Sequence, residues 1–317
     1  MKKIMFLAVF LFGIMLIAPL SVLGEMGEVI SASAKTEVQK NENKGVFKVM
    51  NTEDGKITEI SVEDYIIGVV SAEMPALYEE EALKAQAVAA FTFASQRKNE
   101  NASKEYDITN NHTVDQSFIN KEEMKKKWGE EYDTYYEKIK KAVQAVSGYM
   151  VCFDKKPIVA VYHAISSGKT EDSKDIWGDE FPYLKPVSSE GDKLHKDYLS
   201  EVSFTAEEIR NKLSTETEFS GDESGYFGET KRTDSGVIKE ISVCGKKLTG
   251  ARIRTLLDLR SSNFSIEFKD GKYCFSVFGY GHGVGMSQNG ANYMAKQGSD
   301  FKEILTHYYT GCSVLKK

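Results

Sequence analysis

Cysteine is scarce in this chain, and the spacing of the few present excludes a common metal motif. The 317 residues include only Cys152, Cys244, Cys274 and Cys312, which lie far apart. A structural zinc site needs ligand pairs at short spacings, and the cysteines form no such pair. Four cysteines allow three disulfide pairings, although a large domain requires none. We expect most of them to be small buried apolar residues, and we expect no metal or other cofactor.

Net positive charge and nucleotide-binding motifs are lacking too. The net charge is −6 and the basic residues are spread among acids, which argues against a nucleic-acid partner. The glycine-rich stretch "GYGHGVGMSQNGA", residues 279–291, does not fit G-x-G-x-x-G, because Val284 and Met286 interrupt the pattern, and no Walker Lys-Ser/Thr follows. Alternating glycines instead let the backbone approach a ligand or another segment, and they would hold His282 in a tight loop. A purely structural loop explains this stretch about equally well.

The N-terminus has the pattern of a membrane anchor. Lys2 and Lys3 precede residues 4–24, which carry no charge and are about long enough to span a bilayer. We expect an uncleaved anchor at 1–24 with the rest of the chain outside the cytoplasm, although cleavage after Ala34 is an alternative. Residues 25–45 are polar and lack a sustained period, which predicts a flexible linker before a folded region at 46–317.

The folded region is predicted to be α+β, with mixed helices and short antiparallel sheets around a central groove. Asp54-Gly55 predicts a first hairpin, and Ser61 is expected to cap a short helix through residue 72. Pro75 is expected in the first turn of a long helix over 76–98. Further expected elements are helical residues 121–146, a hairpin turning at 154–157, a long surface loop at 164–192, a strand at 237–243, helices at 204–213 and 248–259, a hairpin turning at 270–271, and two final helices over 288–298 and 300–311.

Glu73 lies between apolar residues, just before Pro75, and two interpretations are open. It could cap the helix expected to begin at Pro75, as acids at helix starts commonly do. It could also be a desolvated proton donor. The long helix that follows is apolar or small on nearly every face between Ala82 and Ala94, so Lys84 and Gln86 need partners or a water-lined groove.

A second polar set comes at the end of a predicted strand, where "YHAISSG" places Tyr162, His163 and Ser166 close together. A Ser-His-Asp triad is conceivable, but the stretch lacks the G-x-S-x-G elbow. Such residues more often line a groove. Trp177 and Tyr183 would either offer flat faces to a sugar or pack in the core.

Taken together, three stretches resemble the stage II sporulation protein D family over roughly residues 46–313. They are "EDYIIGVVSAEMPALYEEEALKAQAVAA", "YHAISSGKTEDSKDIWGDEFPYLKPV" and "GYGHGVGMSQNGANYMAKQGSDFKEILTHYY", in this order after the anchor.

The resemblance implies a lytic transglycosylase that cleaves peptidoglycan glycan strands stripped of stem peptides by an amidase. It places the catalytic acid at Glu73, and groove residues at Lys84, Gln86, Tyr162, His163 and Ser166; we add His282 as a further substrate-binding candidate. It also implies a mother-cell membrane location facing the forespore, with a membrane-bound sporulation amidase and a multispanning engulfment protein as partners. One acid suffices for this chemistry, because the nucleophile is the 6-hydroxyl of the sugar itself, whose intramolecular attack gives a 1,6-anhydro end.

Two departures from the family pattern keep other functions open. Phe91 stands where the family commonly has an arginine, and the loop at 106–118 holds His112 but none of the cysteines of the zinc site of clostridial relatives. The alternative is therefore a non-catalytic glycan-binding module that stimulates a partner amidase. A serine or cysteine hydrolase is a third possibility.

Overall fold

The computed structural model describes residues 45–111 and 114–317, and all structural statements concern these residues. The predicted anchor, the linker up to residue 44 and His112 lie outside them. Among the described residues no helix is both long enough and apolar enough to cross a membrane.

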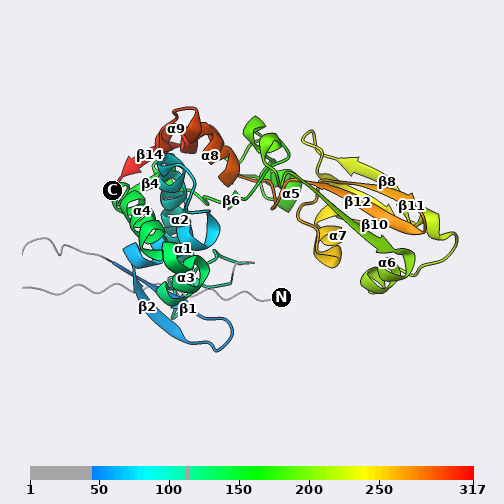
Figure 1. Cartoon of the computed structure of the whole chain (residues 1–317), viewed down its shortest axis with the longest axis horizontal. Helices are drawn as coiled ribbons and strands as arrows, with labels where there is room; N and C mark the ends of the chain where they lie inside the picture. The colour runs from blue at the N-terminus through cyan, green and yellow to red at the C-terminus, as the bar shows by residue number, and fades with distance from the viewer. Residues whose placement is uncertain (1–44, 112–113) are drawn as a thin grey trace, which may run out of the picture. The chain divides into compact units, whose positions relative to one another are not determined.

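Two hydrophobic cores organise the described chain (Figure 1). The first core is built by residues from Phe47 to Leu184 and again from Val284 to Cys312, whereas the second core is built by residues from Phe204 to Val277. The chain therefore leaves the first core, completes the second, and returns. Its last helices, α8 (Gln288–Lys296) and α9 (Phe301–Tyr308), lie beside the early helix α2 (Glu80–Glu100).

The elements of the two cores match the predicted mixture of helices and short strands. Around the first core lie β1 (Val46–Met50), β2 (Ile57–Ser61), α1 (Val62–Glu73), α2, β3 (Ile108–Thr109), α3 (Lys121–Trp128), the 3-10 turn η1 (Gly129–Glu131), α4 (Tyr132–Ala145), β4 (Tyr149–Phe153), β5 (Lys156–Pro157), β6 (Tyr162–His163), α5 (Ser173–Trp177), η2 (Glu190–Leu194), β13 (Met286–Ser287), α8, α9 and β14 (Ser313–Lys316). The second core comprises β7 (Leu199–Thr205), α6 (Ala206–Leu213), η3 (Glu223–Gly225), β8 (Phe227–Arg232), β9 (Ile238–Val243), β10 (Lys246–Leu248), α7 (Gly250–Leu257), β11 (Phe264–Lys269) and β12 (Lys272–Phe278). The α+β prediction is confirmed.

The sheets are small, and not all of them are antiparallel as predicted. The strand orders are β2-β1-β3, β10-β9-β8, β11-β12-β7, β13-β6 and β14-β4-β5. Two of the pairs, β1 with β3 and β6 with β13, are parallel. The β6–β13 pair matters most for function, because it sets Tyr162 opposite Met286 and His163 opposite Ser287. It thereby joins the second and third stretches of the sequence pattern.

Local signals placed several elements correctly. The first hairpin turns through Gly55, whose φ of +71° suits glycine, and the Ser61 hydroxyl accepts a hydrogen bond from the Asp64 N–H at the start of α1. Thr205 closes a capping box with Glu208 on α6. All four cysteines are free thiols; Cys152 and Cys312 are buried as expected, and the other two are half-buried.

The boundary between α1 and α2 differs from the prediction. Helix α1 runs to Glu73, and α2 begins only at Glu80 rather than near Ala76. The residue before a proline is pushed out of the helical region, and Met74 is accordingly extended with φ −118° and ψ +146°. Glu73 is therefore the last residue of α1, which rules out the interpretation in which it caps the start of the next helix.

The expected surface loop at 164–192 is more ordered than predicted. It contains α5 and η2, and the Lys169–Ser188 bridge closes it on itself. Its buried residues include Thr170, Glu171 and Asp192, all about 1% exposed or less. Polar residues this deeply buried need hydrogen-bond partners, so the segment is fixed against its neighbours rather than lying over the surface.

Candidate active site

A cavity of about 380 Å³ opens at the C-terminal end of α1. It brings together four of the predicted site residues, Glu73, Tyr162, His163 and His282, which come from all three stretches of the sequence pattern. The rest of its lining is Ala72, Phe93, Asp115, Gln116, Ser117, Val161, Ala164, Tyr280, Gly281 and Gln288. A concave site with convergent polar groups is the expected form of an active site.

Glu73 is half-buried, and contacts from Ser117 and Lys127 hold it and the end of α1 in place. The Ser117 backbone N–H donates to Glu73 Oε1 at 2.8 Å. The Lys127 ammonium donates to the carbonyls of Ser71 at 2.7 Å and Ala72 at 3.4 Å, on the last turn of α1. A carboxylate at a helix C-terminus meets the negative end of the helix dipole, which favours its protonated form. The Ser117 N–H and the Lys127 charge favour the ionised form, so these effects oppose each other.

The other acid in the lining, Asp115, is already engaged. Arg97 Nε donates to Asp115 Oδ1 at 2.6 Å, and both the backbone N–H and the hydroxyl of Thr109 donate to Oδ2. The Asp115 side chain is only 1% exposed. A carboxylate held by this set of donors has a structural role. Glu73 is therefore the carboxyl group of the lining best placed for proton transfer.

Tyr162 belongs to a buried hydrogen-bonded chain on one wall of the cavity. Its hydroxyl donates to Gln116 Oε1 at 2.8 Å, and Gln116 Nε2 donates to the Tyr65 hydroxyl at 3.2 Å and to the Ala90 carbonyl at 3.4 Å. Burial raises the pKa of both tyrosines, and Glu73 adds to the rise. Both phenols are therefore neutral, and Tyr162 presents a fixed hydroxyl to the cavity.

Gln86 and Lys84 are two residues apart on α2, which places them on nearly opposite faces, and they have different environments. Gln86 is fully buried; its Oε1 accepts from Gln288 Nε2 at 3.4 Å, and its own Nε2 lies near Tyr162 without a hydrogen bond of regular geometry. Lys84 is ion-paired with Glu80 at 2.7 Å and Glu81 at 2.8 Å and does not line the cavity. The structure therefore places Gln86 immediately behind the cavity and Lys84 away from it.

The two histidines of the cavity are neutral and present opposite hydrogen-bonding groups. Burial is the main cause that lowers the pKa of His163 to about 4 and that of His282 to about 3. His163 Nδ1 donates to the Val284 carbonyl at 3.1 Å, which leaves Nε2 as a buried acceptor without a partner. His282 Nδ1 instead accepts from the Val284 N–H at 3.1 Å, so its Nε2 carries the hydrogen. His163 Nε2 can thus accept from a ligand, whereas the Nε2–H of His282 is directed at the Tyr162 backbone carbonyl.

The buried histidine makes stability depend on pH. An unfolded histidine takes up a proton below pH 6.5, whereas folded His163 resists protonation until about pH 4. Wild type should therefore lose stability relative to His163→Gln as the pH falls from 7 to 4, by up to roughly 3 kcal/mol. Urea unfolding of both proteins across this range measures the difference. A constant difference would mean that His163 is not held neutral by burial.

The glycine-rich loop lies directly against the second polar stretch. All four alternating glycines have positive φ, and a Cβ on Gly281 would lie 2.7 Å from His163 Cβ, and one on Gly285 2.2 Å from the Val161 carbonyl oxygen. The Glu171 N–H fixes the loop through the Gly283 carbonyl at 2.8 Å. The close backbone approach predicted from the glycine spacing is confirmed.

Gly285→Ala should therefore destabilise the protein more than strain alone explains. Gly271 is a matched control, because its φ of +75° is nearly that of Gly285, +74°, but no atom lies within 4 Å of an added Cβ. We expect Gly271→Ala to cost about 1 kcal/mol and Gly285→Ala at least about 2 kcal/mol more. Equal losses in urea unfolding of the two variants would contradict the close packing of the loop.

Ser166 is buried outside the cavity lining, in a hydrogen-bonded network around Asp192. Its hydroxyl donates to Asp192 Oδ2 at 2.5 Å, and its N–H donates to the same oxygen at 2.9 Å. Ser189, Ser287 and Asn289 donate to the two Asp192 oxygens as well. The network ties residues 166, 192 and 287 together beneath the β6–β13 pair. Here Ser166 has a positioning role, and its hydroxyl is turned to Asp192.

Aromatic residues also divide between the core and the rim. Tyr183 is buried, and its hydroxyl accepts from the Val159 N–H at 3.1 Å, so it packs in the core. Trp177 is 42% exposed and its ring lies 5.2 Å from that of His282. Phe91 packs against the first core and does not line the cavity. Position 91 therefore contributes no side chain to the lining.

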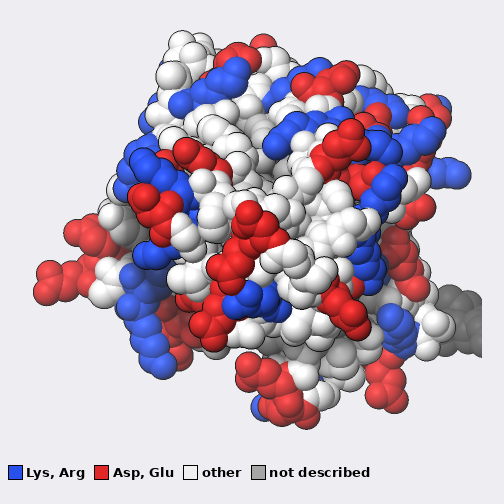
Figure 2. Space-filling view, turned by 90° about the vertical axis from the view of Figure 1, so that its right-hand side faces the viewer, with Lys and Arg blue, Asp and Glu red and all other residues white. Residues whose placement is uncertain are grey.

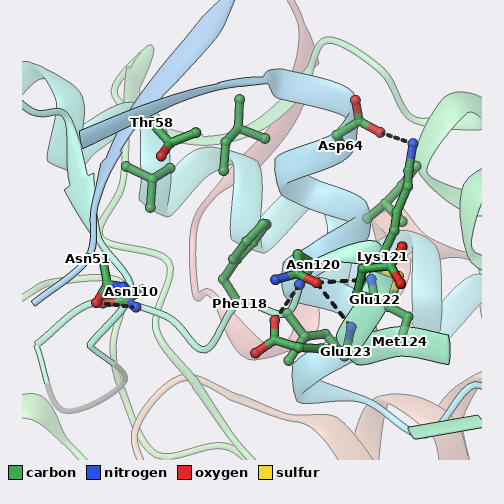
Figure 3. A pocket seen from close by; sticks show the side chains of 14 residues that line it. Asn51, Thr58, Asp64, Asn110, Phe118, Asn120, Lys121, Glu122, Glu123 and Met124 are labelled. Carbon is green, nitrogen blue, oxygen red and sulfur yellow. Dashed lines mark hydrogen bonds and ion pairs between the residues drawn. The ribbon is translucent and has the colours of Figure 1, made fainter. Parts of the chain in front are cut away.

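A larger cavity, of about 640 Å³, lies between the first hairpin and the start of α3 (Figure 3). Its polar groups mostly bind one another. Asn120 caps α3 by accepting from the N–H groups of Glu122 and Glu123, Lys121 pairs with Asp64 at 3.2 Å, and Asn110 donates to Asn51 at 3.3 Å. It contains none of the predicted site residues, so we assign the chemistry to the smaller cavity.

No group of three or more His, Cys, Asp or Glu side chains suited to a metal ion occurs in residues 45–111 and 114–317. The face of the molecule in Figure 2 carries interspersed acidic and basic side chains rather than one sign of charge.

Sequence reasoning missed Gln116, Ser117, Tyr280 and Gln288. The first two belong to an irregular segment without a period, and no local pattern reveals that they meet α1 and β6. Gln288 and Tyr280 lie in or beside the glycine-rich stretch, so their proximity to His282 in sequence was a usable signal.

Comparison with known proteins shows which sequences this chain is similar to. The family model described as "SpoIID: Stage II sporulation protein" matches residues 50–153. Stage II sporulation protein D of Bacillus amyloliquefaciens is 37% identical over 269 residues, covering 84% of this chain and 77% of that protein. The protein of the same name from Bacillus subtilis (strain 168) is 36% identical over 269 residues, covering 84% and 78%. The amidase enhancer of Bacillus subtilis is 25% identical over 299 residues, which cover 78% of this chain but only 40% of that protein.

The matched region contains the end of α1, and the two sporulation proteins align with most of the described chain. With more than 30% identity over more than two thirds of these relatives, the chain belongs to the stage II sporulation protein D family.

Proposed function

We propose that this protein is a lytic transglycosylase that cleaves peptidoglycan glycan strands during sporulation, with Glu73 as its acid and base. The observation that carries the proposal is the meeting of Glu73 with Tyr162, His163 and Gln288 in one cavity. The Ser117 N–H donates to Glu73 Oε1, whereas the other carboxyl group of the lining, Asp115, is held by Arg97 and Thr109. An ordinary glycosidase needs two working carboxyl groups.

The proposed reaction balances with one acid. Protonated Glu73 donates its proton to the glycosidic oxygen as the bond to C1 of the muramic acid breaks. The Glu73 carboxylate then takes the proton of the 6-hydroxyl of the same sugar, whose oxygen bonds to C1. Glu73 is protonated again, the product ends in a 1,6-anhydro ring, and no water is consumed. A single side chain that is first an acid and then a base serves both steps of this reaction.

The neutral polar groups around Glu73 support sugar binding. His163 Nε2 can accept from a sugar hydroxyl, and the fixed Tyr162 hydroxyl and the Gln288 amide lie in the same lining. Trp177, partly exposed beside His282, offers an apolar face to a sugar ring. Neutral donors and acceptors with one aromatic surface match the chemistry of a carbohydrate.

The test is the digestion of purified glycan strands from which stem peptides have been removed. We expect mass spectrometry to find products with anhydro-muramyl ends. Absence of such products, under conditions in which a reference transglycosylase forms them, would contradict the proposal.

A second function is favoured by the similarity to the amidase enhancer. In this alternative the protein binds glycan and stimulates a partner amidase without cleaving glycosidic bonds. It predicts faster amidase turnover on addition of the protein, to the same extent with Glu73→Gln, and no anhydro products. Stimulation that requires Glu73 would contradict it.

The proposed setting is the outer face of the mother-cell membrane, with residues 4–24 as anchor and a sporulation amidase and a multispanning engulfment protein as partners. The uncharged run at 4–24 after two lysines supports the anchor. Membrane fractionation of the full chain, compared with a chain lacking residues 1–24, tests this location. Recovery of both in the soluble fraction would contradict it.

A further inference from the structure

Glu171 is a buried acid that the proposed reaction does not use. The residue is 1% exposed, and its Oε1 has no hydrogen-bond partner among the described residues. It lines a small cavity of about 10 Å³, which has room for about one water. Because a buried polar atom without a partner is unfavourable, a side chain held in this way calls for a physical explanation.

The small cavity lies where three parts of the chain meet. Glu171 lines it from the segment after β6, His282 lines it from the glycine-rich loop, and Val237 and Asn263 line it from the part of the chain that builds the second core. His282 also lines the Glu73 cavity. One histidine therefore borders both cavities, with Glu171 on one side of it and the proposed chemistry on the other.

Glu171 is held against the glycine-rich loop by its backbone and by its side chain. Its N–H donates to the Gly283 carbonyl at 2.8 Å, it forms a bridge with Val284, and a Cβ on Gly283 would lie 3.0 Å from Glu171 Cγ. The Val284 N–H donates to His282 Nδ1, and the Val284 carbonyl accepts from His163 Nδ1. The residue that pairs with Glu171 is thus the one that orients both imidazoles.

The segment of Glu171 is also tied to the turn between β8 and β9. The Ser235 hydroxyl donates to the carbonyl of Thr170, the residue before Glu171, at 3.1 Å. The Ser167 hydroxyl donates to the Ser235 carbonyl at 3.0 Å. Glu171 therefore lies in a joint whose one side is the second core and whose other side is the loop that carries His282.

The surroundings of Glu171 favour its neutral form. Burial raises the pKa of its carboxyl group to about 7, and Asp175 adds to the rise, whereas the Thr233 and Ser235 hydroxyls and the charge of Lys169 oppose it. The other titratable groups of the adjoining elements are Asp234, Lys239 and His282. Asp234 is exposed, and Lys239 is paired with Asp175 at 2.6 Å. His282 is neutral, so no cation offsets the burial of an ionised Glu171 from this side.

We propose that Glu171 is a positioning residue whose neutral carboxyl group fills the joint between the second core and the glycine-rich loop and so holds His282 and His163 at the wall of the Glu73 cavity. Ionisation of the carboxyl group in a cavity with room for one water would loosen the joint. The geometry of the site would then respond to pH near neutrality. The inference rests on the proposed function only in naming the site that is held.

NMR of the full chain labelled with nitrogen-15 at its histidines tests the inference without a substrate. The chain has five histidines, and spectra of His282→Gln and His163→Gln assign the two signals of interest. Because the pKa of His282 is lowered to about 3, its ring does not change protonation near pH 7. We expect the His282 signal of wild type to shift with a midpoint near pH 7, and we expect this shift to be absent in Glu171→Gln.

Urea unfolding gives a second readout. An unfolded glutamate releases its proton near pH 4.5, whereas folded Glu171 keeps its proton until about pH 7. Between these values the unfolded state binds fewer protons, so the stability of wild type relative to Glu171→Gln should fall as the pH rises and level off above pH 7. The unfolding equilibrium constant of wild type should rise by up to roughly 300-fold relative to that of the variant. Glu229 is exposed on β8, and Glu229→Gln should keep the wild-type dependence on pH.

A His282 signal that stays constant between pH 6 and 8, or one that shifts equally in Glu171→Gln, would overturn the inference. Identical pH dependence of unfolding in wild type and Glu171→Gln would overturn it as well. Digestion of stripped glycan strands separates this result from the proposed function. If the His282 shift depends on Glu171 but no anhydro-muramyl products form, only the proposed function fails; if products form and the shift is missing, only the inference fails.

Discussion

Glu73→Gln is expected to remove almost all release of anhydro-muramyl products, by about 10²- to 10⁴-fold, the usual contribution of a general acid. Glutamine has nearly the same shape and can still accept the hydrogen bond from the Ser117 N–H, which is 2.8 Å from Glu73 Oε1. It cannot donate a proton to the glycosidic oxygen or take one from the 6-hydroxyl. Product formation from stripped strands, followed by mass spectrometry, measures the loss.

A matched control shows whether the loss is local. Glu105 is exposed and does not line the cavity, so Glu105→Gln should retain wild-type turnover. Thermal unfolding should show all three proteins folded. Turnover of Glu73→Gln within tenfold of wild type would remove Glu73 from the mechanism.

Asp192→Ala is expected to cause the largest loss of stability, about 3 kcal/mol or more. Asp192 is fully buried, and its carboxylate accepts from Ser166, Ser189, Ser287 and Asn289. The substitution leaves these buried donors without an acceptor. Because they join the segment after β6 to the start of α8, the positions of His163 and Gln288 should be disturbed as well.

Urea unfolding measures this loss, and a second aspartate of the same segment is its control. Asp179 is exposed, and Asp179→Ala should change stability by no more than about 0.5 kcal/mol. Asp192→Ala should also lower turnover in conditions where it remains folded. A stability equal to that of Asp179→Ala would mean that the network does not hold the site together.

Features set by neighbouring residues could be predicted from the sequence. The turn at Gly55, the caps at Ser61 and Thr205 and the tight loop around His282 each follow from side chains within a few positions. The end of α1 at Glu73 lies one residue beyond the predicted end, whereas α2 begins at Glu80 rather than near residue 76.

Long-range contacts limited the prediction of the site. The sequence indicated Glu73, Tyr162, His163 and His282, and the structure brings them into one cavity. Ser166 could not be separated from them by sequence, because its partner Asp192 lies 26 residues later. Gln116 and Ser117 carry no periodic pattern, so only the folded chain reveals their contacts with Tyr162 and Glu73.

The central claim is that one carboxyl group drives an intramolecular attack that uses no water. Digestion of stripped glycan strands in water enriched in oxygen-18 tests it most directly, because each new end shows which oxygen attacked C1. The account predicts 1,6-anhydro ends without the heavy oxygen. Ends that are heavier than the anhydro form by one molecule of oxygen-18 water, with the heavy oxygen at C1, would identify hydrolysis and contradict it.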